Sequence, residues 1–457
     1  MATNPSTASV SAPRLRRTLT LWDLILYGVI VIQPVAPMSV FGVLSDRGHG
    51  HVVTTILIAM VAMLFTAISY GRMARAYPSA GSAFTYVGQE INPALGYVTG
   101  WSMVMDYMLN PMICIIWCSQ QAHVFAPNVP YAVWALFFAG VFTFMNIQGV
   151  KTSARVNTLL ATGMGVVITI FFVAAARYIF GHPHDDAAFF TRPFYDPQTW
   201  DTRAVLGGTS IAVLTYIGFD GISTLSEEAE NPRRNILFAT VLVCVVIGIL
   251  SAVEVYAAQL VWPASQPFPN SDTAFTFVAQ RAWPPLFAIM GFTLLVANFG
   301  SGLGAQIGAA RLLYGMGRSN ALPKSFFGAI DPKHHVPRNN VLFVGVIALA
   351  AALLVSFGVF SYGLGAEMLN FGALIAFMGV NAAAFMRYYV REPEKKFTNL
   401  APPVLGFLIC LLLWLNLSRP AKIGGAIWMA VGIAFGAWKT RGFRGDLVNF
   451  DLPPEEA

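Results

Sequence analysis

The chain has 457 residues, of which 56% are hydrophobic and only 11% are charged, and its mean hydropathy is +0.62. Soluble domains carry about 25% charged residues, so this composition indicates a polytopic membrane protein and argues against a water-soluble enzyme. The net charge of +6 could suggest a nucleic-acid partner. We predict none, because the basic residues follow the pattern expected of loops on one side of a membrane.

About twelve segments reach the length of roughly 20 apolar residues that a bilayer-spanning helix needs. They cover residues 20–43, 53–71, 93–122, 131–147, 157–180, 205–228, 236–262, 285–316, 341–358, 367–390, 402–417 and 423–438. The first segment is too long for a signal peptide. The sequence therefore predicts an all-α polytopic membrane protein of about twelve transmembrane helices.

The distribution of Lys and Arg predicts the orientation of these spans. With the N-terminus inside, most of the 28 basic residues fall in the inner loops and ends. By the positive-inside rule, both termini are then cytoplasmic, and the chain is a multi-pass protein of the cell inner membrane.

The sixth span contains an acid, Asp220, between Gly218 and Gly221. A charge near the bilayer centre costs several kcal/mol, so it usually faces a cavity and marks function. The flanking glycines allow the helix to unwind there. The first span is interrupted by Pro34 and Pro37, which lack backbone donors. Breaks in the first and sixth spans are what an inverted repeat of a secondary transporter requires.

Motifs along the chain resemble the amino acid–polyamine–organocation superfamily. They are RMARAYPSAGSAFTYV at 72–87 and NPRRNI at 231–236. A narrower resemblance, to bacterial putrescine importers, is carried by the segments 19–37, 50–73, 77–87, 96–113, 218–236, 309–318 and 370–381. The resemblance implies a LeuT-like fold of two inverted five-helix repeats with broken helices 1 and 6, followed by two more helices. It also implies proton-driven import of a small organic amine.

This resemblance divides the chain into four parts. Residues 1–18 are expected to form a disordered cytoplasmic tail, and residues 19–390 a ten-helix transport core. Residues 391–438 would supply the two additional transmembrane helices, and residues 439–457 a second cytoplasmic tail.

The first-helix break indicates the class of substrate. Amino-acid carriers of the superfamily typically have a Gly-Ser-Gly run there, whose bare amides receive the substrate carboxylate. Gln33 and Pro34 stand at the matching positions, and they favour a substrate without a carboxylate, such as putrescine or a related polyamine.

Asp220, with Phe219, Gly218 and Gly221, is the leading candidate for holding an ammonium group. An ammonium–carboxylate pair is stronger at reduced dielectric than in water. Asp106 and Tyr107 in the third span are candidates for a second ammonium and for a cation–π contact. Alternatively, Asp106 stabilises its helix by bonding to Ser or Asn neighbours.

Three further acids are candidates for gating or coupling. Glu227 and Glu228 could guard the inner exit or pair with Arg233 and Arg234. Glu254, in an apolar span, could take up the coupling proton or could reach water from the outer third of the membrane.

No cofactor and no metal site are predicted. The alternative function is an amino-acid permease or an amino acid/amine exchanger of the same superfamily. A nutrient sensor is a rival from another class, and a membrane enzyme is disfavoured because HExxH and nucleophile-elbow motifs are lacking.

Overall fold

The computed structural model describes residues 19–77, 82–149, 154–182, 186, 188–226, 229–318, 322–334 and 336–442. The tail predicted at 1–18 and most of the tail predicted at 439–457 lie outside these residues, as do Glu227 and Glu228. Within the described part the chain is helical, apart from turns and one isolated β-bridge between Leu19 and Ala229.

The long continuous helices coincide with ten of the predicted spans. They are α3 (Val52–Ala76), α5 (Pro93–Phe125), α6 (Tyr131–Ile147), α7 (Ala154–Gly181), α9 (Pro232–Val261), α11 (Leu286–Arg318), α13 (Arg338–Val355), α14 (Tyr362–Phe385, continued by the π-helical turn η4, Met386–Val390), α15 (Phe397–Leu415) and α16 (Arg419–Lys439).

The first and sixth spans are discontinuous. The first consists of α1 (Leu21–Ile32) and α2 (Ala36–Arg47), which are bent by 42°. The sixth consists of α8 (Thr202–Ala212) and the 3-10 turns η1 (Val213–Tyr216) and η2 (Asp220–Leu225). The two predicted helix breaks are therefore present.

Ten helices in the described part of the chain are long and apolar enough to cross a membrane, and the bent pair brings the number to eleven. Helix α6 is also apolar but has 17 residues. The chain is thus a multi-pass helical membrane protein, while the count of twelve spans and the inverted repeat stay predictions.

The loops contain short helices that the sequence analysis did not predict. Helix α4 (Ser82–Glu90) lies between α3 and α5, and α12 (Lys324–Phe327) lies before α13. The segment 263–284, between two predicted spans, contains η3 (Ser271–Thr273) and α10 (Ala274–Ala282).

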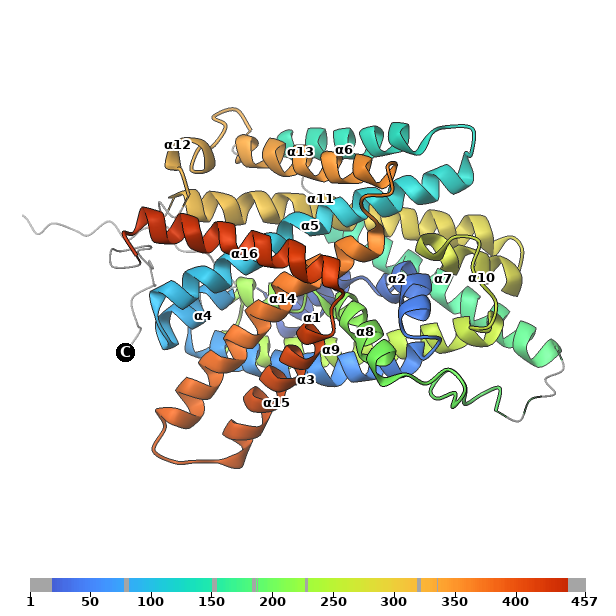
Figure 1. The fold of residues 1–457 in the computed structure, drawn as a ribbon, viewed down its shortest axis with the longest axis horizontal. Helices are drawn as coiled ribbons and strands as arrows, with labels where there is room; N and C mark the ends of the chain where they lie inside the picture. The colour runs from blue at the N-terminus through green and yellow to red at the C-terminus, as the bar shows by residue number, and fades with distance from the viewer. Residues whose placement is uncertain are drawn as a thin grey trace, which may run out of the picture.

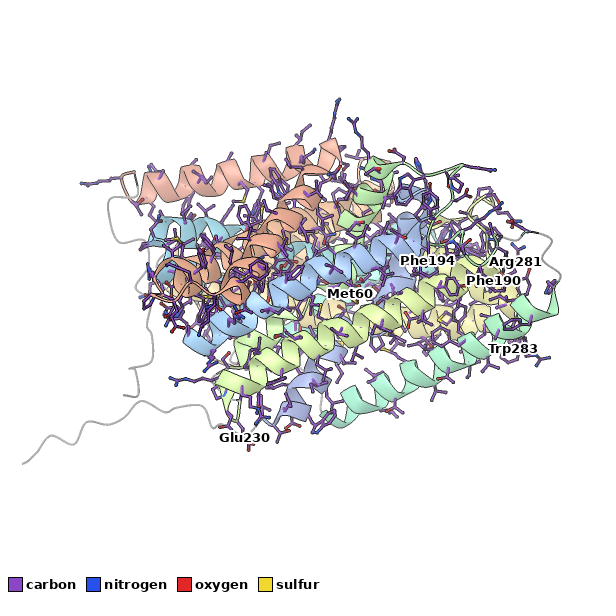
Figure 2. All side chains as sticks on the ribbon, turned by 90° about the horizontal axis from the view of Figure 1, so that it is seen from below. Met60, Phe190, Phe194, Glu230, Arg281 and Trp283 are labelled. Carbon is purple, nitrogen blue, oxygen red and sulfur yellow. The ribbon has the colours of Figure 1, made fainter. Side chains whose placement is uncertain are left out.

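The helices pack in layers around the two broken spans. In Figure 1, α6 and α13 form one edge of the molecule, α5 and α11 lie beneath them, and α14 crosses the centre, where it contacts α5, α3 and α15. Figure 2 shows α3 and α9 side by side, with Met60 on α3. A Cβ on Gly248 of α9 would lie 2.5 Å from the Met60 sulfur, so a small residue is needed for this close approach.

Candidate functional site

The first break lies between α1 and α2 and follows from two prolines. Pro34 disfavours a helical conformation of the residue before it, and Gln33 takes a φ of 67°. Pro37 stands in the first turn of α2, where a missing N–H costs nothing. The Gln33 side chain anchors the break, because its Nε2 donates a 2.7 Å hydrogen bond to the carbonyl oxygen of Ala297 on α11.

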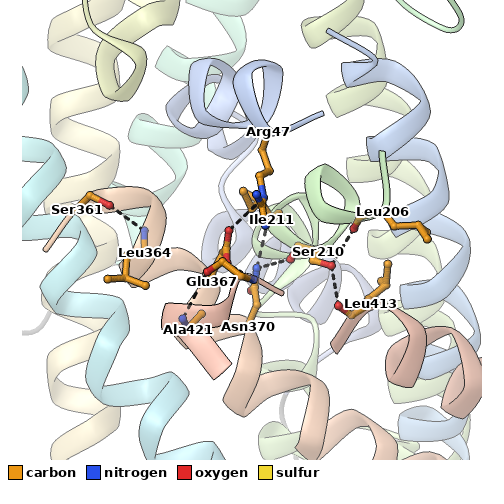
Figure 3. A network of polar contacts seen from close by, with 11 residues as sticks. Arg47, Leu206, Ser210, Ile211, Ser361, Leu364, Glu367, Asn370, Leu413 and Ala421 are labelled. Atoms are coloured by element: carbon orange, nitrogen blue, oxygen red, sulfur yellow. Dashed lines mark hydrogen bonds and ion pairs between the residues drawn. The ribbon is translucent and has the colours of Figure 1, made fainter. Parts of the chain in front are cut away.

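The second break lies after α8, where the last carbonyls of the helix lose their intrahelical partners. Asn370 of α14 supplies replacements: its Nδ2 donates to the carbonyl oxygens of Ser210, at 2.7 Å, and Ile211, at 3.4 Å (Figure 3). The Thr215 hydroxyl donates to the carbonyl oxygen of Ala212 at 2.7 Å. The unwound segment is therefore held by side chains, as buried irregular backbone in a membrane requires.

The two breaks touch each other. Gly218 has a φ of 123°, a conformation that only glycine adopts readily. A Cβ at Gly218 would lie 2.9 Å from the Val31 side chain and 3.2 Å from that of Ile32, both at the end of α1. A Cβ at Gly221 would lie 3.6 Å from the Tyr27 hydroxyl. The close approach to α1 therefore requires glycine at position 218, whereas a Cβ at position 221 would make an ordinary van der Waals contact.

Asp220 lies at the start of η2 and is only 4% exposed. The backbone N–H of Gly218 donates a 3.1 Å hydrogen bond to its Oδ1, and the Ser223 hydroxyl donates to its backbone carbonyl oxygen at 2.6 Å. Within the described residues, no Lys or Arg forms an ion pair with Asp220. The carboxylate is therefore buried without a protein counter-charge.

Asp106 and Tyr107 come to the same place from α5. Asp106 is also 4% exposed, and its carboxylate lies close enough to Asp220 for the two charges to repel. The Tyr107 side chain interacts with Asp220. Helix α14 can approach here because Gly372 has no side chain: a Cβ would lie 2.5 Å from the carbonyl oxygen of Ser102.

An aromatic cluster borders these carboxylates. Phe219 is fully buried, and its ring meets that of Tyr70 on α3 edge to face, with centroids 5.6 Å apart. Its centroid lies 5.4 Å from that of Phe377 on α14, with the two rings tilted. The sequence analysis singled out Phe219 but missed Tyr70 and Phe377. Tyr70 offered one signal, a hydroxyl within an apolar span.

The predicted site residues thus fall into groups. One group lies at the α1 break and consists of Gly218, Phe219, Asp220 and Gly221. Asp106 and Tyr107 of α5 interact electrostatically with Asp220 of this group. Gln33 and Pro34 also lie at the α1 break, but the side-chain amide nitrogen of Gln33 donates its hydrogen bond to α11. No hydrogen bond joins Asp106 to a Ser or Asn neighbour within the part of the chain described.

Glu254 lies apart from this site, on α9. It is 0% exposed, so the alternative that it reaches water is wrong for this conformation. Neither of its carboxylate oxygens has a hydrogen-bond partner among the described residues, and the same holds for the hydroxyl of Ser251, one turn earlier. An unpaired buried carboxylate is costly, which favours the neutral acid.

Two groups of polar contacts lie at opposite ends of α14. At one end, Glu90 of α4 is fully buried and accepts hydrogen bonds from Arg387 and Arg391, each at 2.6 Å, and from the Tyr77 hydroxyl at 2.7 Å. Burial, and next the hydrogen bond to Glu90, raises the pKa of Tyr77 to about 12. The phenol therefore stays protonated at neutral pH.

At the other end, Arg47 of α2 lies 3.5 Å from Glu367 of α14 (Figure 3). Glu367 also accepts a 2.7 Å hydrogen bond from the backbone N–H of Ser418, just before α16. A cavity of about 570 Å³ lies here, lined in part by Asp46 and Asp272. Burial raises the pKa of Asp272, opposed by a hydrogen bond from Gln120.

No cluster suited to a metal ion is found among the described residues. The four cysteines are buried and form no disulfide. The polar atoms of the site are carboxylates, hydroxyls and backbone groups, which suit an organic cation.

Two touching helix breaks within a bundle of membrane-spanning helices are typical of secondary transporters. The family model described as Amino acid permease matches residues 35–440, and the chain belongs to this family of transporters.

Relatives within the family differ in what they carry. The chain is 34% identical to the low-affinity putrescine importer PlaP of Escherichia coli K12, over 97% of this chain and 98% of that protein. It is 24% identical to the branched-chain amino acid permease BcaP of Bacillus subtilis, over 92% of each. It is 26% identical to the chloroplastic cationic amino acid transporter 6 of Arabidopsis thaliana, over 86% of this chain and 69% of that one.

Proposed function

We propose that this protein imports a small organic amine, putrescine or a related polyamine, across the cell inner membrane by proton-coupled alternating access. The observation that carries the proposal is the buried pair Asp220 and Asp106, which lacks a protein cation among the described residues. Two carboxylates that repel each other are stabilised by a ligand with two positive charges, and a diamine supplies one ammonium for each.

The first-helix break supports an amine rather than an amino acid. A substrate carboxylate needs free backbone N–H groups at the end of a half-helix. Pro34 has no N–H, and the backbone N–H of Gln33 already donates to the carbonyl oxygen of Val29, while its side-chain amide donates to that of Ala297. Two acids without a nearby base would also repel a carboxylate. The similarity to PlaP, named a putrescine importer, points the same way.

Alternating access would require contacts at the two ends of α14 to break in turn, and polar contacts lie at both ends. The ion pairs of Glu90 with Arg387 and Arg391 join α4 to the segment at the C-terminal end of α14. The ion pair of Arg47 with Glu367 joins α2 to the N-terminal end of α14. Opening one end requires breaking one of these groups of contacts while the other holds. The 3.5 Å pair of Arg47 and Glu367 is the looser of the two.

The proposal is tested by uptake of radiolabelled putrescine into proteoliposomes, with and without an inward proton gradient. We expect accumulation that the gradient increases and that unlabelled putrescine inhibits. Uptake of a labelled neutral or basic amino acid instead, with no competition by putrescine, would favour the amino-acid permease that the resemblance to BcaP and to the cationic amino acid transporter represents.

A further inference from the structure

Tyr70, on α3, is a fully buried tyrosine beside the candidate site. Its hydroxyl has no hydrogen-bond partner among the described residues. Leaving a buried hydroxyl without a partner costs about 1–3 kcal/mol. Such a cost is usually offset by a role, so the surroundings of this hydroxyl indicate what it can bind.

The charged and polar groups that act on Tyr70 are those of the proposed amine site. Asp220 acts on it most strongly, followed by Tyr107, Tyr86 and Asp106. The hydroxyl of Tyr70 therefore lies within electrostatic range of both carboxylates, and no Lys or Arg of the described residues acts on it.

The Tyr70 ring is held in a fixed orientation by three other rings. Its centroid lies 5.6 Å from that of Phe219, 5.8 Å from that of Phe377 and 6.2 Å from that of Tyr86, all in edge-to-face geometry. A ring packed in this way cannot swing away, so its hydroxyl is preorganised for a ligand.

Two other buried tyrosines use their hydroxyls to hold the scaffold. Tyr216 donates to the carbonyl oxygen of Ile56 at 2.9 Å, and Tyr97 donates to that of Gly432 at 3.1 Å. Tyr70 makes no such bond to the scaffold, although it is equally buried. Unlike the hydroxyls of Tyr216 and Tyr97, the hydroxyl of Tyr70 is available to a ligand.

We propose that Tyr70 is a substrate contact, whose hydroxyl oxygen accepts a hydrogen bond from the ammonium group held at Asp220. This inference rests on the proposed function and deepens it. A primary ammonium has three N–H donors, as a lysine side chain does. Asp220 takes one or more of them, and Tyr70 takes another. The site thereby selects primary ammonium groups over methylated ones, which lack these donors.

The inference is tested with Tyr70→Phe, which removes only the hydroxyl oxygen and keeps the packed ring. Tyr97→Phe is the matched control, because it removes a buried hydroxyl bound to α16, away from the site. In proteoliposomes we expect the KM for putrescine to rise about tenfold in Tyr70→Phe, since hydrogen bonds to charged groups are the stronger ones. We expect it to stay within about twofold in Tyr97→Phe.

A second measurement separates a ligand contact from a structural role. The unmodified protein should prefer n-butylamine to butyltrimethylammonium as an inhibitor of putrescine uptake, and Tyr70→Phe should lose most of this preference. The melting temperature of substrate-free Tyr70→Phe should not fall, because the deleted hydroxyl has no protein partner.

An unchanged KM and an unchanged preference in Tyr70→Phe, with normal uptake by the unmodified protein, would overturn the inference and leave the proposed function standing. So would a marked fall in melting temperature, since it would make the hydroxyl structural. If the unmodified protein itself failed to take up or bind putrescine, the proposed function would be contradicted, and this inference with it.

Discussion

Asp220 and Asp106 are unusual because the protein buries both without supplying a cation. A buried carboxylate in a stable scaffold is normally paired or hydrogen-bonded several times. Glu90 in this same chain shows that case, with two arginines and a tyrosine around it. Asp220 instead is held by backbone N–H groups and by the Tyr107 side chain, with no Lys or Arg paired to it among the described residues. The contrast indicates that its full charge is balanced only when a cationic ligand or a proton is bound.

We predict that Asp220→Asn abolishes putrescine uptake, because the neutral amide keeps the shape of the side chain but cannot pair with an ammonium. The loss should exceed about 100-fold, as for removal of a buried charge partner. Uptake and the amount of protein in the membrane are measured together. Glu394→Gln, at an exposed ion pair with Lys396, serves as control and should transport normally. Near-normal transport by Asp220→Asn would refute this assignment.

For Asp106 the prediction concerns selectivity. If Asp106 binds the second ammonium, Asp106→Asn should weaken inhibition by diamines about tenfold or more while changing inhibition by monoamines of the same length little. Competition against labelled putrescine with 1,4-diaminobutane and n-butylamine measures this difference. An equal loss for both amines would instead make Asp106 structural.

The acids of the candidate site can be picked out from the sequence, whereas the aromatic residues that border them cannot. Acids are so rare in apolar spans that Asp220 and Asp106 stand out without any structure. Tyr70 and Phe377 do not, since aromatic residues are common in membrane helices. Which of them faces the site depends on how α3 and α14 rotate against η2, and this is set by packing between helices remote in sequence.

At the scale of elements, the helix breaks were predictable, whereas what holds them was not. Prolines and glycines mark the breaks at 33–37 and 218–221, because they act on their own backbone. The partners of the freed carbonyls come from other helices: Asn370 of α14 serves α8. Helices α4 and α10 were missed for a related reason, since they are short and stabilised by contacts with α5, α2 and α11.

The sixth-span break should therefore depend on Asn370. Asn370→Leu would leave the carbonyl oxygens of Ser210 and Ile211 without their donor, at a cost of about 1–3 kcal/mol. We expect a lower melting temperature and a reduced maximal rate of uptake. Asn416→Leu is the control, since Asn416 donates to Leu412 at the exposed end of α15. Equal stability of the two variants would show that Asn370 does not support the break.

For the molecule as a whole, the orientation in the membrane is predicted from the distribution of charge alone and can be tested directly. The four native cysteines are buried, so single introduced cysteines can report sidedness. Thr199→Cys, before α8, should react with a membrane-impermeant maleimide in intact cells. Glu394→Cys, between α14 and α15, should react only after permeabilisation. The reverse pattern would contradict the prediction that both termini are cytoplasmic.

The proposed coupling to protons is also a property of the whole molecule, because it requires a proton site and an amine site to change together. We propose Glu254 as the proton site, because it is fully buried on α9 and its carboxylate oxygens have no partner among the described residues. Coupling to the amine site would pass through α9, which packs against α1 and η2.

Glu254→Gln mimics the protonated acid permanently, and it should separate transport from coupling. We expect this variant to exchange internal for external putrescine at a rate near that of the unmodified protein, but to lose most of the accumulation driven by an inward proton gradient. Glu230→Gln, at an exposed acid before α9, should keep both activities. If Glu254→Gln still accumulated putrescine in response to the gradient, the coupling proton would have to bind elsewhere, and the repelling pair Asp220 and Asp106 would become the site to test.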